Sequence, residues 1–86
     1  MPYFVYILES EKNGRLYIGQ TNNIAARLKR HNAGMEKSTS PYIPWILLHS
    51  EAIPTRSEAV LLERRLKGFK SRKRIFNWIE EMKNKT

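Results

Sequence analysis

Leu16-Tyr-Ile-Gly-Gln-Thr21 lies at the centre of a segment, Tyr3 to His31, around which the rest of the chain is organised. Residues 3–8 are aromatic or aliphatic, a composition typical of a β-strand. The polar segment that follows ends in Asn13-Gly14, the dipeptide that most strongly indicates a β-hairpin, and a second strand is predicted over residues 15–19. The segment therefore predicts two antiparallel strands joined by a short loop.

A helix is expected directly after this hairpin. Thr, Asn and Asn at positions 21–23 are good N-caps, and residues 24–32 have helical spacing that closes on Gly34, a residue type favoured just after a helix end. Four side chains of this helix fall on one stripe, at positions i, i+3, i+4 and i+7: Ile24, Arg27, Leu28 and His31. The apolar members should face the sheet, which brings the arginine and the histidine to its border.

The number of residues in the hairpin loop decides where two tyrosines point. With an even number, Tyr6 and Tyr17 project to the same side of the sheet and Gly19 leaves a gap beside them. With an odd number, the two phenols lie on opposite faces, and the sequence leaves both arrangements open. In the first arrangement, both phenols converge with Arg27 and His31 at one edge between sheet and helix, as in a functional site.

Length and composition indicate a single small domain spanning residues 1–86, with a core over about 3–79 and a polar tail at 83–86. The absence of cysteine excludes disulfides, a thiol nucleophile and cysteine-ligated metal. The N-terminus has no basic leader, its apolar run is too short for a signal peptide, and no run approaches the ~20 apolar residues of a membrane helix. We therefore expect a cytoplasmic protein with no membrane partner.

The charge balance favours a polyanionic partner. Sixteen Lys and Arg against eight Asp and Glu give a net charge of +8, for which nucleic acid is the commonest partner and a merely solvated basic surface the alternative. The cations crowd the C-terminal third and the first helix, interleaved with aromatic residues, as phosphate-contacting and base-stacking surfaces require. We expect these residues to contact nucleic acid: Gly19, Lys29, Arg30, Lys37, Thr39, Lys67, Lys70, Arg72 and Lys73. At positions 37–39, the solubility of a loop explains the polar residues equally well.

A third strand is predicted after the first helix. A loop with two prolines over residues 35–44 leads to the apolar stretch Trp45 to Ser50, which is bounded by Pro44 and Pro54. His49 is a lone histidine at the end of this stretch, and such a residue is more often at the surface or in packing than catalytic.

Two further helices complete the chain. Thr55 and Glu58 match a capping box, and the helix that follows carries a stripe expected to face the core: Ala59, Leu62, Leu66 and Phe69. Ser71 is expected to cap a final helix with its own apolar stripe: Ile75, Trp78, Ile79 and Met82. The predicted order β-β-α-β-α-α corresponds to an α+β fold, with a small, mainly antiparallel three-stranded sheet flanked by helices.

Glu63 lies beside the apolar stripe of the first of these two helices, and its role is open. It either forms an intrahelical ion pair with Lys67 one turn on, or presents a carboxylate at the rim of the sheet that holds a divalent cation. The spacing alone favours neither.

Five landmarks, in this order, resemble the GIY-YIG nuclease superfamily, above all its small stand-alone bacterial members: Phe4-Val-Tyr6, Tyr17-Ile-Gly19, Arg27, His31 and Glu63. The likeness covers about residues 3–79. By this resemblance, Tyr6 is the tyrosine of the first motif, and Tyr17 and Gly19 belong to the second. Arg27 matches the arginine that meets the scissile phosphate. His31 matches a position where the family often has histidine or tyrosine, and Glu63 matches the metal-binding glutamate.

The chain departs from the family pattern in three places. Phe4 and Val5 replace the glycine and the isoleucine of the first motif, a change that the small members share. Gln20 stands where many active relatives have lysine, so a cation that would tune a tyrosine is absent there. The C-terminal asparagine of the family has no secure match, because neither Asn77 nor Asn84 fits its position well.

The resemblance implies phosphodiester hydrolysis with one Mg²⁺ or Mn²⁺ ion on Glu63 and water in most of its coordination shell. Arg27 would hold a non-bridging phosphate oxygen in its planar fork. A tyrosine, Tyr6 first and Tyr17 second, would orient or deprotonate the attacking water, which requires nearby positive charge to lower its pKa from ~10. We expect that charge to come from Arg27, the metal ion and a protonated His31.

We therefore expect a divalent-metal-dependent, endonuclease-like domain that acts on DNA in preference to RNA. Sequence specificity should be low, because so small a domain has little surface for reading bases. A binding module of the same fold that has lost turnover is the alternative, and a basic protein-interaction domain is a third class. Steep weakening of binding by salt separates the first two from the third. The chain is expected to be a monomer or a weak homodimer.

Overall fold

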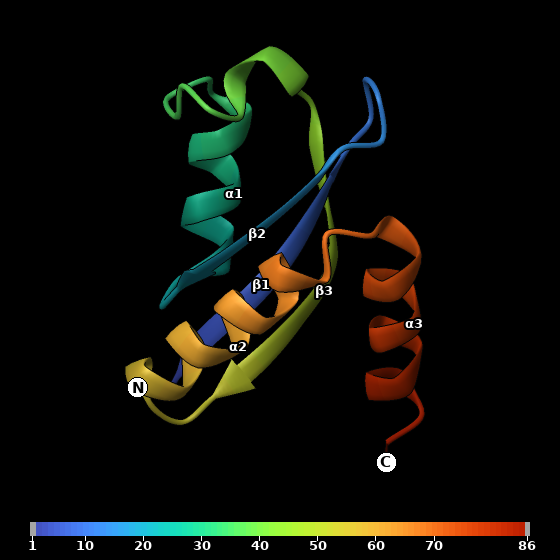
Figure 1. Cartoon of the computed structure of the whole chain (residues 1–86). Coiled ribbons are helices and arrows are strands. Elements are labelled where there is room, and N and C mark those ends of the chain that lie inside the picture. Colours follow the sequence, from blue (N-terminus) through green and yellow to red (C-terminus); the bar gives the residue numbers. More distant parts are fainter. Residues whose placement is uncertain (1, 86) are drawn as a thin grey trace.

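Three antiparallel strands form the sheet, and the N-terminal strand lies in the middle. In the computed structural model, which describes residues 2–85, β1 (Tyr3–Ser10) pairs with β2 (Leu16–Thr21) on one side and with β3 (Trp45–Ile53) on the other. The helices are α1 (Ile24–Asn32), a short 3₁₀ helix η1 (Ser40–Tyr42), α2 (Arg56–Phe69) and α3 (Arg72–Lys83). Apart from η1, this is the predicted order, and the expected α+β fold is confirmed (Figure 1).

The register of the β1–β2 hairpin places both tyrosines on the same face of the sheet. Tyr6 pairs with Gly19 and Leu8 with Tyr17, and paired residues of antiparallel strands point to the same side. Gly14 closes the turn with a φ of 78°, which glycine adopts without steric cost, and its N–H donates to the carbonyl of Ser10 at 2.8 Å. Of the two arrangements that the sequence allows, the structure has the one that brings the phenols together.

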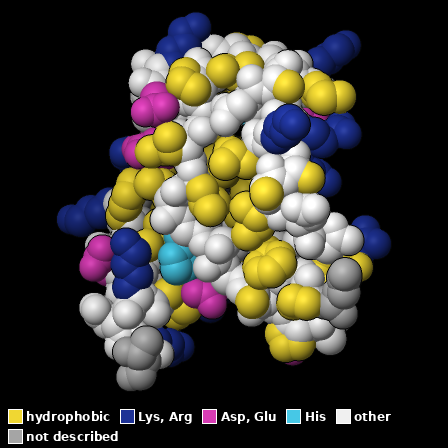
Figure 2. Space-filling model, turned by 180° about the vertical axis from the view of Figure 1, so that it is seen from behind, with side chains coloured by type: hydrophobic (Ala, Val, Ile, Leu, Met, Phe, Trp, Pro, Cys, Tyr) yellow, Lys and Arg dark blue, Asp and Glu magenta, His cyan; other side chains and the backbone are white. Residues whose placement is uncertain are grey.

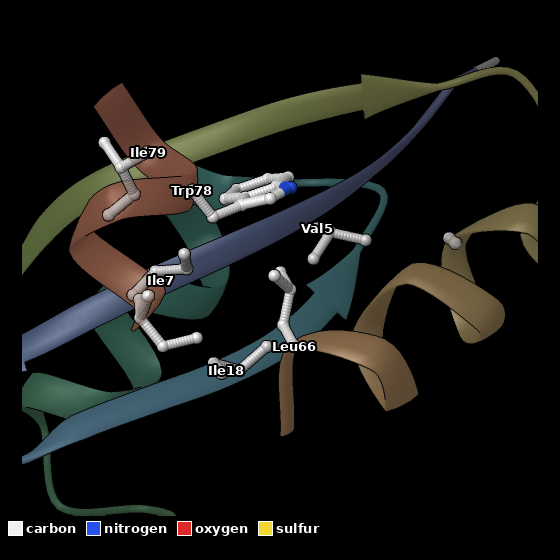
Figure 3. Close-up of a cluster of buried hydrophobic side chains, with 8 residues drawn as sticks. Val5, Ile7, Ile18, Leu66, Trp78 and Ile79 are labelled. Carbon is white, nitrogen blue, oxygen red and sulfur yellow. The ribbon is translucent and has the colours of Figure 1, made fainter. Parts of the chain in front are cut away.

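Each face of the sheet has its own hydrophobic cluster. The larger cluster joins the sheet to α2 and α3 (Figure 3): Val5, Ile7, Ile18, Ala59, Leu66, Ile75, Trp78 and Ile79. The smaller cluster lies on the other face, next to Leu28 of α1: Tyr6, Leu8 and Trp45. Because burying one large apolar side chain contributes roughly 1.5–3 kcal/mol, these clusters fix α1 and α2 on opposite faces of the sheet.

The α-helices begin at the N-caps that the sequence predicts. The cap side chains accept hydrogen bonds from backbone N–H groups three residues on, at 3.1–3.3 Å: Asn23 for α1, Thr55 for α2 and Ser71 for α3. Lys70 ends α2 in the left-handed conformation, with a φ of 51°. Within residues 2–85, no helix is both long and apolar enough to cross a membrane.

Several predicted boundaries are wrong. β1 runs to Ser10 instead of ending at residue 8, and β2 covers Leu16–Thr21 instead of residues 15–19. β3 runs to Ile53 instead of ending at Ser50, because β1 continues to pair with it as far as Tyr3. His49 is therefore inside the strand, where its ring packs edge-on against Trp78 with 5.5 Å between ring centroids. At the C-terminus, α3 extends through Lys83, so this residue is not part of a free tail; Thr86 lies outside the described residues.

Candidate active site

A chain of hydrogen bonds runs from Tyr6 through His31 to the loop after α1. The Tyr6 hydroxyl lies 3.1 Å from Nε2 of His31, and Nδ1 of His31 lies 2.8 Å from the hydroxyl of Thr39. The Thr39 hydroxyl in turn donates to the carbonyl oxygen of Glu36 at 3.4 Å. Because a carbonyl only accepts, we infer that Nδ1–H donates to Thr39 and that Nε2 accepts the Tyr6 proton. The chain thus holds His31 in one tautomer and Tyr6 as a donor.

The Tyr6 phenol is buried and stays protonated. Its side chain is 1 % exposed, and this burial raises the pKa of Tyr6 above its usual value. The phenol of Tyr17 and the charge of Glu63 raise the pKa of Tyr6 further, and the charge of Arg27 lowers it. Desolvation therefore outweighs the charge of Arg27, which by itself does not bring the pKa of this phenol below its usual value.

The imidazole of His31 is neutral, contrary to the expected protonated form. His31 is 1 % exposed, and burial lowers its pKa below the usual value for histidine. The carboxylate of Glu36 opposes this change, whereas Arg27 and Arg30 reinforce it. His31 therefore serves as a hydrogen-bond acceptor for Tyr6 rather than as a source of charge.

Acidification from pH 7 to pH 5 is expected to destabilise the protein partly through His31. The pKa of histidine is ~6.5 in the unfolded chain, and that of His31 is lower in the folded protein. The unfolded state therefore binds more protons between pH 7 and pH 5. For this reason the free energy of unfolding falls as the pH falls. Urea denaturation of the His31→Gln variant should show a weaker pH dependence than the parent. Equal pH dependence in the parent and His31→Gln would contradict the buried neutral imidazole.

The ring of Tyr17 packs against Tyr6 and His31, while its hydroxyl faces solvent. Its ring centroid lies 6.2 Å from that of Tyr6 and 4.8 Å from that of His31, edge-on to the imidazole. Within residues 2–85, every buried polar side-chain atom has a hydrogen-bond partner, and the Tyr17 hydroxyl makes no bond there, so it is open to water. Gly19 permits this packing, since a Cβ atom at that position would lie 2.6 Å from the Tyr6 hydroxyl and 3.0 Å from the Tyr17 ring.

A polar cleft of about 250 Å³ opens where β2 ends and the chain turns into α1. Its lining consists of six residues: Tyr3, Gln20, Thr21, Asn22, Arg27 and Arg56. Arg27 was expected at the site, and Arg56, the first residue of α2, was missed. One sequence signal could have identified Arg56: it directly follows the N-cap of a helix, where the helix dipole disfavours a cation, so a positive charge there indicates another role. The two guanidinium groups make this cleft suitable for a phosphate.

Glu63 lies on the face of β2 opposite to the tyrosines. Gln20 follows Gly19 in β2, so its side chain points to the other face, where its amide donates to Oε1 of Glu63 at 3.0 Å. Nζ of Lys67 lies 2.7 Å from Oε2, and the Glu63 side chain is 17 % exposed. Both interpretations of Glu63 therefore hold in part: the intrahelical pair forms, and the carboxylate reaches the rim of the sheet.

The surroundings of Glu63 fit a cation that arrives together with a substrate. Among residues 2–85, no group of three or more His, Cys, Asp or Glu side chains could enclose a metal ion. Mg²⁺ commonly takes one or two carboxylates and completes its shell with water and substrate phosphate. The ammonium group of Lys67 shows that positive charge is accommodated at Oε2. The donor set thus suits a shared metal–phosphate site and not a closed structural one.

The five expected catalytic side chains are brought together to different degrees. Tyr6, Tyr17 and His31 are in direct contact. Arg27 lies one turn before His31 on α1, and both Arg27 and Glu63 act on Tyr6 through their charges without a hydrogen bond to it. The expected convergence at the edge of the sheet is therefore tight for the rings and looser for the two charged groups.

The expected nucleic-acid contacts differ in how accessible they are. Thr39 is 1 % exposed and its hydroxyl is hydrogen-bonded to His31 and Glu36, and Gly19 is also buried. Three exposed cations form ion pairs: Arg30 with Glu36, Lys67 with Glu63, and Arg72 with Glu9. Four others are exposed and form no ion pair within the described chain: Lys29, Lys37, Lys70 and Lys73.

The face opposite to that of Figure 1 does not present a continuous basic surface. Figure 2 shows Lys and Arg around its margins and mainly hydrophobic or uncharged atoms across its middle. The arginine cleft and Glu63 lie along β2, where the cleft is lined by Gln20 and Thr21 of that strand.

The chain is thus a small α+β domain in which two phenols and a buried imidazole pack together and an arginine cleft opens at the end of β2. The chain belongs to the GIY-YIG family, since the family model described as "GIY-YIG catalytic domain" matches residues 2–83. This family is a nuclease superfamily whose members generally use divalent metal ions.

Proteins named UPF0213 are similar to the chain over most of their length. One from Staphylococcus haemolyticus is 39% identical over 80 residues, which are 92% of this chain and 95% of that protein. One from Haloquadratum walsbyi is 36% identical over 73 residues, 84% of this chain and 81% of that protein. The solution NMR structure of a UPF0213 protein from Bacillus halodurans is 32% identical, with a TM-score of 0.58. The match covers 93% of this chain and 84% of the chain in that structure. The resemblance to the small bacterial members of the superfamily is thus confirmed.

Proposed function

We propose that the domain hydrolyses phosphodiester bonds in nucleic acid, DNA in preference to RNA, with the help of one divalent metal ion. The observation that carries the proposal is the packing of Tyr6, Tyr17 and His31 at the edge strand β2, at whose end the cleft of Arg27 and Arg56 opens. Membership of a nuclease superfamily supports it. Low sequence specificity, a cytoplasmic location and a monomer or weak homodimer belong to the same proposal.

The arginine cleft binds the scissile phosphate in this proposal. Arg27 and Arg56 reach the cleft from different helices, so together they can hold two non-bridging oxygens and fix the phosphate relative to β2. Planar guanidinium groups also stabilise the charge that builds up on these oxygens in the transition state.

Tyr17 contacts the attacking water in this proposal, which reverses the order in which the tyrosines were expected to act. Its hydroxyl is open to solvent, whereas the Tyr6 hydroxyl is buried and occupied by His31. Tyr6 and His31 act as positioning residues, because their rings pack against Tyr17 and restrict its orientation. The Tyr17 oxygen then accepts a hydrogen bond from the water and aligns it with the phosphate.

Glu63 would hold the metal ion, either Mg²⁺ or Mn²⁺. When bound, such an ion supplies Lewis acidity and stabilises the leaving oxygen. Gln20, which stands in place of the lysine of many relatives, orients the carboxylate through its hydrogen bond to Oε1. The ammonium group of Lys67 pairs with Oε2 and must move aside when a metal ion takes its place.

A binding module without turnover is the second candidate, and one observation favours it. Both carboxylate oxygens of Glu63 are engaged, by an amide and by an ammonium group, so a metal ion has to displace Lys67 to bind there. In that case the arginine cleft and the exposed lysines would bind nucleic acid but not cut it.

Chelation of divalent metal is expected to abolish cleavage and to leave binding in place. Labelled single-stranded, duplex and branched DNA, and RNA, are incubated with the protein in Mg²⁺, in Mn²⁺ and in EDTA. Cleavage should appear only with metal, and the substrate cut fastest identifies the substrate class. Binding in EDTA should weaken steeply with salt, because each phosphate contact releases counterions.

Three outcomes separate the classes of function. Salt-sensitive binding without cleavage in any metal would establish the binding module. Equal affinity for nucleic acid and for an acidic protein would contradict both nucleic-acid proposals. Cleavage undiminished by EDTA would contradict the role of the metal ion alone.

A further inference from the structure

A hollow of about 330 Å³ lies between the β1–β2 hairpin, the end of α2 and the start of α3, away from the arginine cleft. Its apolar walls come from four side chains: Leu16, Ile18, Leu66 and Ile75. Lys67, Lys70 and Arg72 add three cations, whereas Arg15, whose residue also lines the hollow, turns its guanidinium onto the ring of Tyr42. The volume is at the small end of ligand pockets, which span roughly 300–1,000 Å³. An apolar hollow with a cationic rim suits a flat, weakly polar ring attached to an anion.

Glu63 separates this hollow from the arginine cleft. Its Oε1 is held by Gln20, which lines the cleft, and its Oε2 by Lys67, which lines the hollow. Leu16 and Gln20 stand at the two ends of this stretch of β2, about 13 Å apart at the rise of a strand. A nucleic-acid strand whose phosphate sits in the cleft therefore reaches the hollow within a short stretch of backbone.

Lys70 occupies a backbone conformation that its residue type does not favour. Its φ of 51° is left-handed, a position at helix ends that is usually taken by glycine or asparagine, and it costs a lysine of order 1–2 kcal/mol. Lys70 forms no ion pair within residues 2–85. A lysine kept at a strained position at the mouth of a hollow points to a function for its charge.

Arg72 has a different part in the rim. It donates to the carbonyl of Gly14 and to the carboxylate of Glu9, and its guanidinium lies 4.8 Å from the ring centroid of Phe76. These contacts hold the Arg72 side chain where it closes the hollow between the hairpin and α3. Lys70 is therefore the cation of the rim that is available to a ligand.

We propose that this hollow binds one unpaired nucleobase of the nucleic-acid strand that crosses Glu63, with the adjacent phosphate on Lys70. A base in a duplex is stacked and paired and cannot enter, so the hollow selects single strands, flaps and frayed ends. This proposal deepens the proposed function and rests on it for the identity of the strand. Its ligand class, an extruded base with its phosphate, also sets where cutting occurs: close to a junction between paired and unpaired nucleotides.

Binding is measured in EDTA, so that it does not depend on cleavage. Fluorescence anisotropy compares a labelled single-stranded oligonucleotide, the same oligonucleotide made abasic at every position, and a duplex of equal length. The intact single strand should bind roughly 5- to 100-fold more tightly than its abasic counterpart, because the apolar walls remove the ring of the base from water. 2-Aminopurine in the strand should brighten on binding, because the apolar walls named above contain no aromatic ring on which it could stack.

Lys70→Gly removes the cation of the rim and keeps the backbone conformation at this position. Glycine relieves the left-handed strain, so the melting temperature should rise by about 4–8 °C. At the same time, affinity for the single strand should fall about tenfold, and the slope of log K against log salt should lose about 0.7. Lys85→Gly removes the same charge beyond the far end of α3 and is the matched control, with affinity close to that of the parent.

The results separate this proposal from the proposed function. Equal affinity for the intact and abasic strands, or equal affinity of Lys70→Gly and Lys85→Gly, would overturn the nucleobase site even if the protein cuts DNA. Tight binding with a bright 2-aminopurine signal supports the site even if no metal supports cleavage, and then only the proposed hydrolysis fails.

Discussion

Glu63→Gln is expected to lower the rate of metal-dependent cleavage by about 10³-fold, while the free energy of unfolding stays within about 1 kcal/mol of the parent. The amide keeps an oxygen that can accept the hydrogen bond from Gln20, so the local packing survives. The pair with Lys67 one turn on is lost, and such a pair on a helix contributes only a few tenths of a kcal/mol. Cleavage suffers far more, because a neutral amide is a poor ligand for Mg²⁺ and the Lewis acid is lost with it.

Single-turnover cleavage at several metal concentrations tests this expectation. Glu80→Gln, which makes the same change on the exposed face of α3, should cut like the parent. Binding of DNA in EDTA should be unchanged or slightly tighter for Glu63→Gln, since a negative charge near the strand is gone. Cleavage within tenfold of the parent at every metal concentration would show that Glu63 is not the metal ligand.

The sequence predicts the sheet and helices well because their signals are local. Alternating or continuous apolar residues mark the strands, and the side chains of Asn23, Thr55 and Ser71 cap the helices where the pattern places them. The end of β3 was missed because residues 50–53 are partly polar, and an edge strand tolerates that when its neighbour still offers hydrogen bonds.

The candidate site is less predictable, because its geometry depends on contacts between distant residues. Whether Tyr6 and Tyr17 share a face depends on how many loop residues stay unpaired, which no residue type specifies. Thr39 belongs to a loop without periodicity, so its burial against His31 has no local signal. The same reason applies to the charge of His31, whose pKa is lowered by burial against β1, β2 and the loop after α1.

Glu63 shows how tertiary structure can make two interpretations of one residue true at the same time. Spacing on α2 predicts either an ion pair with Lys67 or a carboxylate at the sheet rim, as if one excluded the other. The carboxylate has two oxygens, and Gln20 from β2 takes the one that Lys67 leaves free. Only the packing of α2 on the sheet decides this, and it places the carboxylate between the arginine cleft and the hollow.

Gly19→Ala is expected to lower the free energy of unfolding by about 2–4 kcal/mol and to disturb the packing of the site. A Cβ atom at this position would lie 2.6 Å from the hydroxyl oxygen and 2.7 Å from Cζ of Tyr6, distances that real structures do not contain. Tyr6 is 1 % exposed and cannot swing into solvent, so the sheet or the ring has to shift. Overpacking of this kind costs about 1–3 kcal/mol, and the hydrogen bond to His31 contributes about 1 kcal/mol more when it is broken.

The same substitution at Gly68 is the matched control and should act in the opposite direction. Nothing lies within 4 Å of a Cβ atom at Gly68, which is in α2, so alanine there should raise the free energy of unfolding by about 0.5–1 kcal/mol. Urea denaturation of both variants measures the difference, and the near-ultraviolet circular dichroism of the tyrosines reports whether the ring cluster has moved. Because Tyr6 and Tyr17 both lie against Gly19, a shift should appear in Gly19→Ala alone, together with slower cleavage. A Gly19→Ala protein as stable as the parent would contradict the close approach of Tyr6 to β2 on which the geometry of the site depends.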